Sequence, residues 1–98
     1  MRPALAVLFL CACSTTIDVK NYKQGCTQDS DCAPVYAGDV CALCPCPNAA
    51  IAASELTRYQ SDSQSLHGRC HSNAQADCVP CPSVTAFCLG GTCAVHAQ

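Results

Sequence analysis

The stretch that decides the fold of this chain is residues 78–93, Cys78-Val-Pro-Cys-Pro-Ser-Val-Thr-Ala-Phe-Cys-Leu-Gly-Gly-Thr-Cys93. Gly90-Gly91 suits a two-residue hairpin turn, because both turn positions need a positive φ that glycine adopts freely. This register places Cys88 opposite Cys93, with both side chains on one face of the hairpin. A direct bond across such a pair is strained, so we expect each cysteine to bond to a different partner in the core.

The chain as a whole is rich in cysteine. Of 98 residues 12 are cysteines, and ten of them follow residue 25. These ten are expected to form a disulfide framework: Cys26, Cys32, Cys41, Cys44, Cys46, Cys70, Cys78, Cys81, Cys88 and Cys93. An even number leaves no thiol unpaired in an oxidising compartment. The connectivity stays open, since ten cysteines allow about nine hundred pairings.

The hydrophobic content of the chain overstates its capacity to form a core. Half of the residues are hydrophobic, yet 12 of these are cysteines and 15 are alanines. A domain this small with so few large apolar side chains needs covalent support. Disulfides supply about 3 kcal/mol each by restricting the unfolded chain. The composition therefore predicts a small disulfide-rich domain.

The N-terminus has the form of an export signal. Met1-Arg2 supplies a positive charge, and residues 3–10 are an apolar run of the length that a signal peptide uses. About 20 apolar residues are needed to cross a bilayer, so the run is too short for a transmembrane helix. We expect residues 1–12 to be a signal peptide that is removed.

The end of this leader, Leu10-Cys11-Ala12-Cys13, resembles a bacterial lipobox, although Cys11 stands where a small residue is usual. The resemblance implies cleavage after Ala12 and lipidation of the Cys13 thiol, with several acyl chains giving a stable membrane anchor. Ser14 in the following position implies sorting to the outer membrane of a Gram-negative cell envelope. Ordinary signal peptidase would cut the same bond without adding a lipid.

Two regions follow the leader in this interpretation. Residues 13–25 are predicted to be a polar tether that reaches up to about 40 Å when extended. Residues 26–95 form the cysteine-rich domain. Within it, residues 34–40 resemble a small hairpin with Gly38 in the turn.

One helix is predicted over residues 48–67, the longest stretch of the domain without cysteine. Asn48 is a suitable N-cap and Gly68 a suitable terminator. Five residues recur at alternating spacings of four and three, which would place them on one largely apolar stripe of a helix. They are Ala52, Leu56, Tyr59, Ser63 and Leu66. The predicted fold class is an irregular α+β domain with short hairpins and this single helix.

Cysteine spacing carries a family resemblance as well. The segment Cys26-Thr-Gln-Asp-Ser-Asp-Cys32, with the later Gly38-Asp-Val-Cys41 and the C-terminal cysteines, resembles the small cysteine-cluster modules of secreted and lipid-anchored proteins in myxobacteria and related bacteria. The first segment also resembles part of a whey-acidic-protein core, but the adjacent Cys-Cys pair of that family is missing. The resemblance therefore implies an exported disulfide-rich module and assigns it no chemistry.

The Cys-x-x-Cys pairs at residues 41–44 and 78–81 leave two other interpretations open. Four thiolates suit tetrahedral zinc, although 33 residues between the pairs is wider than a zinc ribbon uses. A thioredoxin-type redox pair at residues 78–81 is the second alternative, but no βαβ pattern surrounds it. Behind an export signal we favour structural disulfides and expect no bound metal.

Charge and the remaining polar residues indicate no catalytic site. A net charge of −2 with five lysines and arginines provides no basic face for nucleic acid. His67, His71 and His96 are isolated, and Asp29 and Asp31 are expected to cap a turn. We therefore expect no enzyme activity and no cofactor.

The sequence thus predicts a lipid-anchored envelope domain with a structural or binding role. Its partners are the membrane, reached through the N-terminal lipid, and an unidentified envelope protein. Any binding surface is expected on the loops at residues 33–40 or 71–87.

Intact mass of the mature protein under non-reducing conditions distinguishes the three functional hypotheses. We expect the loss of ten hydrogens and no bound metal, because all ten framework cysteines are oxidised. Ten free thiols with zinc would indicate a metal protein. Eight locked cysteines with one reducible pair would indicate an oxidoreductase.

Overall fold

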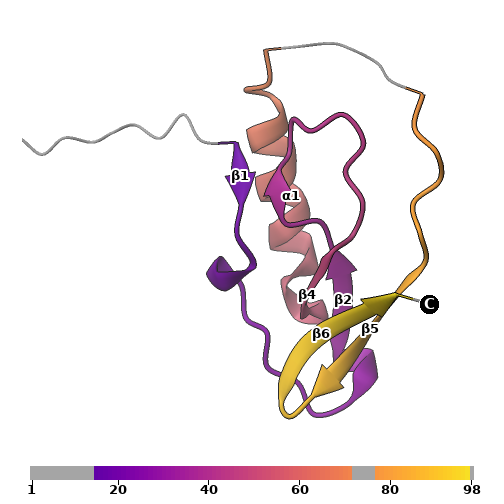
Figure 1. Ribbon diagram of the computed structural model, residues 1–98. Coiled ribbons are helices and arrows are strands. Elements are labelled where there is room, and N and C mark those ends of the chain that lie inside the picture. The colour runs from indigo at the N-terminus through magenta and orange to yellow at the C-terminus, as the bar shows by residue number, and fades with distance from the viewer. Residues whose placement is uncertain (1–14, 72–76, 98) are drawn as a thin grey trace, which may run out of the picture.

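The computed structural model describes residues 15–71 and 77–97, and within these ranges it contains one α-helix and three two-stranded antiparallel sheets (Figure 1). The elements are β1 (Thr16–Ile17), η1 (Val19–Asn21), η2 (Asp29–Asp31), β2 (Cys32–Val35), β3 (Gly38–Asp39), β4 (Ala49–Ala52), η3 (Ala53–Glu55), α1 (Leu56–His67), β5 (Val84–Leu89) and β6 (Thr92–Ala97), where η denotes a 3-10 helix. The predicted class, a small disulfide-rich α+β domain, is confirmed.

The C-terminal hairpin has the predicted turn and register. β5 pairs with β6, and Gly90 and Gly91 form the turn with φ values of 59° and 86°. Cys88 lies opposite Cys93, yet the first bonds to Cys26 and the second to Cys32. The expectation that each would bond to a different partner is confirmed.

The predicted hairpin over residues 34–40 is wrong. β2 instead pairs with β4, which follows later in the chain, and β3 pairs with β1 near the N-terminus. Gly38 has a φ of 144° and lies under the Tyr36 side chain, whose hydroxyl would come within 2.7 Å of an added Cβ. This glycine permits a close side-chain approach and does not form a hairpin turn.

The α-helix starts at Leu56, eight residues after the predicted start at Asn48. Residues 49–52 form β4 because Ala50, Ile51 and Ala52 are all buried, and three consecutive buried residues need cover on both faces of a strand. A helix would turn one of them toward solvent. Asn48 caps no helix and instead accepts a hydrogen bond from the backbone N–H of Ala37 at 2.8 Å.

The end of α1 agrees with the prediction. The N–H of Gly68 donates to the carbonyl of Gln64, and the helix stops at His67. Leu56, Tyr59 and Leu66, three members of the predicted stripe, pack against the core.

The core consists of Ile17, Tyr22, Val35, Val40 and Ile51. The first two come from the segment predicted to be a tether. Ile17 is 4% exposed and Tyr22 7%, and the Tyr22 ring meets the Tyr59 ring edge to face at 5.8 Å. Residues 15–25 therefore belong to the folded domain, because Ile17 and Tyr22 are buried in its core and Val19 packs against them.

Replacement of Ile51 by alanine tests this arrangement. Ile51 is 0% exposed, so Ile51→Ala leaves a cavity and should lower the free energy of unfolding by about 2–5 kcal/mol. Leu89→Ala is the control, since Leu89 is 63% exposed and its truncation should change stability by less than about 0.5 kcal/mol. Urea unfolding under non-reducing conditions measures both, and equal effects would contradict the core assignment.

Candidate binding surface

Five disulfides cross-link the described part of the domain. The bonds are Cys26–Cys88, Cys32–Cys93, Cys41–Cys70, Cys44–Cys78 and Cys46–Cys81. Each of them joins a cysteine that precedes α1 to one that follows it. The segments on the two sides of the helix are thereby held together covalently.

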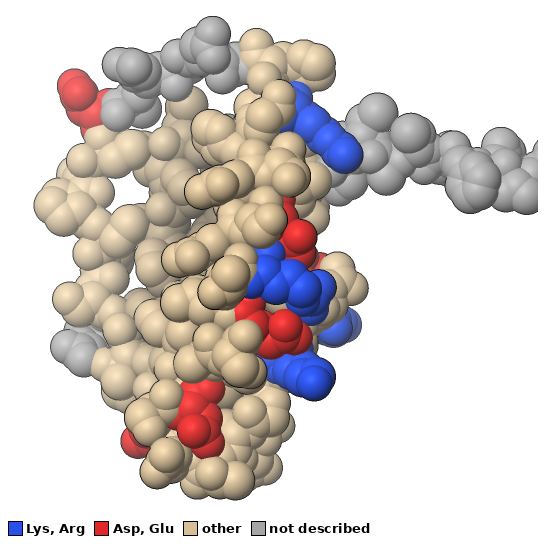
Figure 2. Space-filling view, turned by 180° about the vertical axis from the view of Figure 1, so that it is seen from behind, with Lys and Arg blue, Asp and Glu red and all other residues tan. Residues whose placement is uncertain are grey.

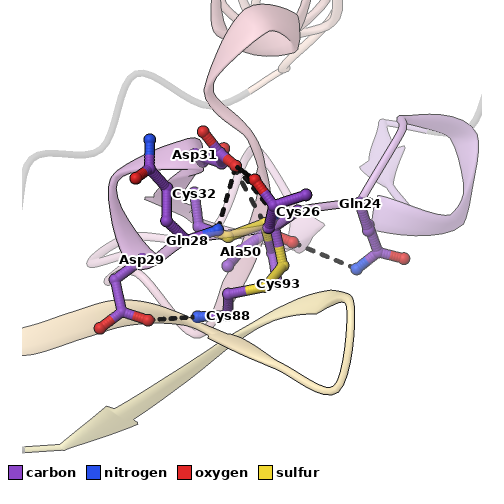
Figure 3. The surroundings of a disulfide bond; sticks show 10 residues. Gln24, Cys26, Gln28, Asp29, Asp31, Cys32, Ala50, Cys88 and Cys93 are labelled. Carbon is purple, nitrogen blue, oxygen red and sulfur yellow. Dashed lines mark hydrogen bonds between the residues drawn. A yellow bond between two sulfur atoms is a disulfide. The ribbon is translucent and has the colours of Figure 1, made fainter.

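Two aspartates support the bonds to the C-terminal hairpin (Figure 3). The Asp29 carboxylate accepts the backbone N–H of Cys88 at 2.9 Å. Asp31 accepts the N–H of Thr27 at 2.8 Å and that of Gln28 at 3.1 Å, which closes the turn locally. The Thr27 N–H is the largest cause that lowers the pKa of Asp31. The predicted turn-capping role is confirmed for Asp31, whereas Asp29 binds the distant backbone of β5.

In the described residues, the one group of three cysteines whose sulfur atoms lie together does not come from the predicted metal motifs. Cys26, Cys32 and Cys93 place their Sγ atoms within 4.8 Å of one another. All three are in disulfides and offer no thiolate for a metal ion. Neither Cys-x-x-Cys motif is bonded internally, so the structure fits a disulfide framework better than the zinc or redox alternatives.

The most exposed part of the domain is a pair of loops, residues 41–47 and 77–83, which we call the loop pair. Cys44–Cys78 and Cys46–Cys81 bond the two loops side by side. Residues 77–83 are all exposed. Leu43 is 59% exposed and Val79 81%, and each adjoins the Cys44–Cys78 bond in sequence. The cross-link therefore places two exposed large apolar side chains next to it in sequence.

A cleft of about 280 Å³ lies next to the loop pair. It is lined by Tyr36, Val40, Ala42, Leu43, Pro45, Tyr59, Ser63 and His67. The Tyr59 hydroxyl donates to the carbonyl of Tyr36 at 2.7 Å and accepts its N–H at 3.2 Å, which fixes one wall. Burial raises the pKa of Tyr59, so this wall stays neutral. The size and the mixed lining suit one apolar or aromatic side chain of a partner.

A second and larger cleft, of about 530 Å³, lies between η1 and α1. Here the Arg58 guanidinium sits 4.3 Å from the centre of the Tyr22 ring, and the Tyr22 hydroxyl donates to Asp62 at 2.6 Å. Burial and this hydrogen bond raise the pKa of Tyr22 to about 12. Arg58 also donates to the carbonyl of Asn21 at 2.6 Å and pairs with Glu55 at 3.2 Å. The polar and charged groups in this cleft are bonded to one another, and these bonds hold η1 against α1.

The structure describes most of the two loop regions in which the sequence predicts a binding surface. In residues 33–40, Val35 and Val40 are buried, and Tyr36 and Val40 line the cleft beside the loop pair. In residues 71–87, the stretch 77–83 is exposed and residues 84–87 belong to β5. Sequence reasoning missed the cleft, because Tyr36, Tyr59 and His67 lie far apart along the chain. Cys13 falls outside the described residues.

Comparisons with protein-family models, curated proteins and solved structures find no match to this chain. In the part of the chain that the structure describes, no helix has the length and apolarity needed to cross a membrane.

Removal of individual disulfides tests how the loop pair is held. Cys46→Ala with Cys81→Ala opens only the short ring next to Cys44–Cys78 and should lower the free energy of unfolding by about 2 kcal/mol. Cys32→Ala with Cys93→Ala should lower it by about 3 kcal/mol or more, because the ring is longer and Cys93 is buried. Urea unfolding measures both double variants. A larger loss from the loop-pair bond would show that the loops support the core.

Proposed function

We propose that this chain is a lipid-anchored, non-enzymatic domain of the bacterial cell envelope that presents a disulfide-stapled surface to another envelope protein. The observation that carries this proposal is the complete pairing of the ten cysteines after Cys13. Closed disulfides persist in an oxidising compartment outside the cytoplasm. The pairing leaves Cys13, at the lipobox-like end of the leader, as the candidate for lipidation.

The binding role is supported by the chemistry of the loop pair. Leu43 and Val79 stay exposed beside a core of only five large side chains, and Leu43 also lines the neighbouring cleft. A partner that inserts an apolar side chain there would bury both the cleft and its rim. The loops are already ordered by two disulfides, so binding would cost little conformational entropy.

The resemblance of residues 26–95 to bacterial cysteine-cluster modules also supports a location in the cell envelope. The sorting implied by Ser14 specifies the outer membrane. Within this proposal, the acyl chains on Cys13 supply the membrane contact and the folded domain supplies the protein contact.

Metabolic labelling with radioactive palmitate tests the anchor. The wild-type protein should incorporate label, and Cys13→Ala should abolish incorporation because the acceptor thiol is lost. Cys11→Ala is the matched control: it removes the neighbouring thiol, restores a small residue before Ala12, and should leave labelling intact. Equal labelling of wild type and Cys13→Ala would contradict lipidation at Cys13.

A further inference from the structure

The folded domain begins very close to the proposed lipidation site. Thr15 is already tied to the domain, since its carbonyl accepts the N–H of Val40 at 2.9 Å and its hydroxyl donates to Asp39 at 2.6 Å. Only Ser14 separates Thr15 from Cys13. Two Cα–Cα steps span at most about 7 Å, against the 40 Å expected of a free tether.

The basic side chains are gathered near this starting point. Figure 2 shows the lysines and arginines of the described residues along one edge of the molecule, interleaved with acidic groups. They are Lys20, Lys23, Arg58 and Arg69, and all four are exposed. Arg58 pairs with Glu55 and Asp62. Within residues 15–71 and 77–97, the other three make no ion pair.

The same edge contains β1, η1 and the outer face of α1. Arg58 on the helix donates to the backbone of Asn21 in η1, and Asp62 accepts from Tyr22 just beyond it, so η1 is bound to α1. Asp18 alone separates β1 from η1 in the sequence. The loop segment 77–83 lies on the opposite side of the molecule (Figure 1). An anchor attached next to β1 therefore constrains the orientation of the whole domain.

We propose, on the basis of the proposed anchor at Cys13, that the edge formed by β1, η1 and α1 lies directly on the lipid headgroups. Acyl chains fix Cys13 at the membrane interface, and the short connection leaves no room to lift β1 away from it. Lys20, Lys23 and Arg69 make no ion pair in the described residues and can contact anionic headgroups within a Debye length. Asp18, Glu55 and Asp62 lie on or next to the same elements, so the short connection to the anchor carries the proposal and not net charge. The loop pair then faces away from the membrane, open to a protein partner.

Paramagnetic relaxation tests this orientation on the intact lipidated protein. The sample is the protein in nanodiscs of phosphatidylethanolamine and phosphatidylglycerol that carry a gadolinium chelate on the headgroups. Relaxation enhancement at the amides of Ile17, Val19 and Lys20 should exceed that at Val79 and Cys81 at least several-fold.

A linker insertion provides the matched control. About twelve Gly and Ser residues placed between Ser14 and Thr15 extend the reach by about 40 Å, which should lower the enhancement at β1 and η1 several-fold. The same insertion after Ala97 should leave the enhancement unchanged. No loss with the first insertion would overturn the direct contact.

The outcomes separate this inference from the proposed function. Equal enhancement at both edges, in a protein that incorporates palmitate through Cys13, would overturn the orientation while the anchor stands. A protein that incorporates no palmitate would overturn both proposals. Enhancement confined to the loop pair would show that the opposite edge faces the bilayer.

Discussion

The disulfides that cross α1 are the constraint on which the rest of the structure depends. Each of the five described cysteines before the helix is bonded to a cysteine after it, so the segments on the two sides of α1 are held against one another. The core between them has five large buried side chains, which is little for a domain that must order some eighty residues. Cross-links act on the unfolded chain by removing its freedom, and therefore stabilise segments that bury almost nothing.

The exposed loops illustrate this source of stability. Residues 77–83 are all exposed, and two disulfides bond them to the loop at residues 41–47. Leu43 and Val79 are exposed beside Cys44–Cys78. At the N-terminal side, by contrast, burial of apolar side chains orders the chain. Ile17 and Tyr22 pack in the core, so the folded domain begins close to the proposed lipid on Cys13.

Features that depend on local chemistry were predictable from the amino acids. The Gly90-Gly91 turn follows from the φ angles it requires, and the register of Cys88 and Cys93 follows from the turn. The end of α1 at His67 and the turn-forming role of Asp31 are local in the same sense. The loop pair could be predicted only as a region, while its cleft depends on residues brought together from distant segments.

The sequence by itself determined that this is a small, oxidised, disulfide-rich domain, because cysteine parity and sparse apolar content do not depend on how the chain folds. Only the tertiary structure decided the connectivity, the strand at Ala49–Ala52 and the burial of the segment before Cys26. An alanine-rich stretch fits either a helix or a buried strand, and β2 and β6 settle the choice by packing against it. Such long-range contacts are not encoded in any local pattern.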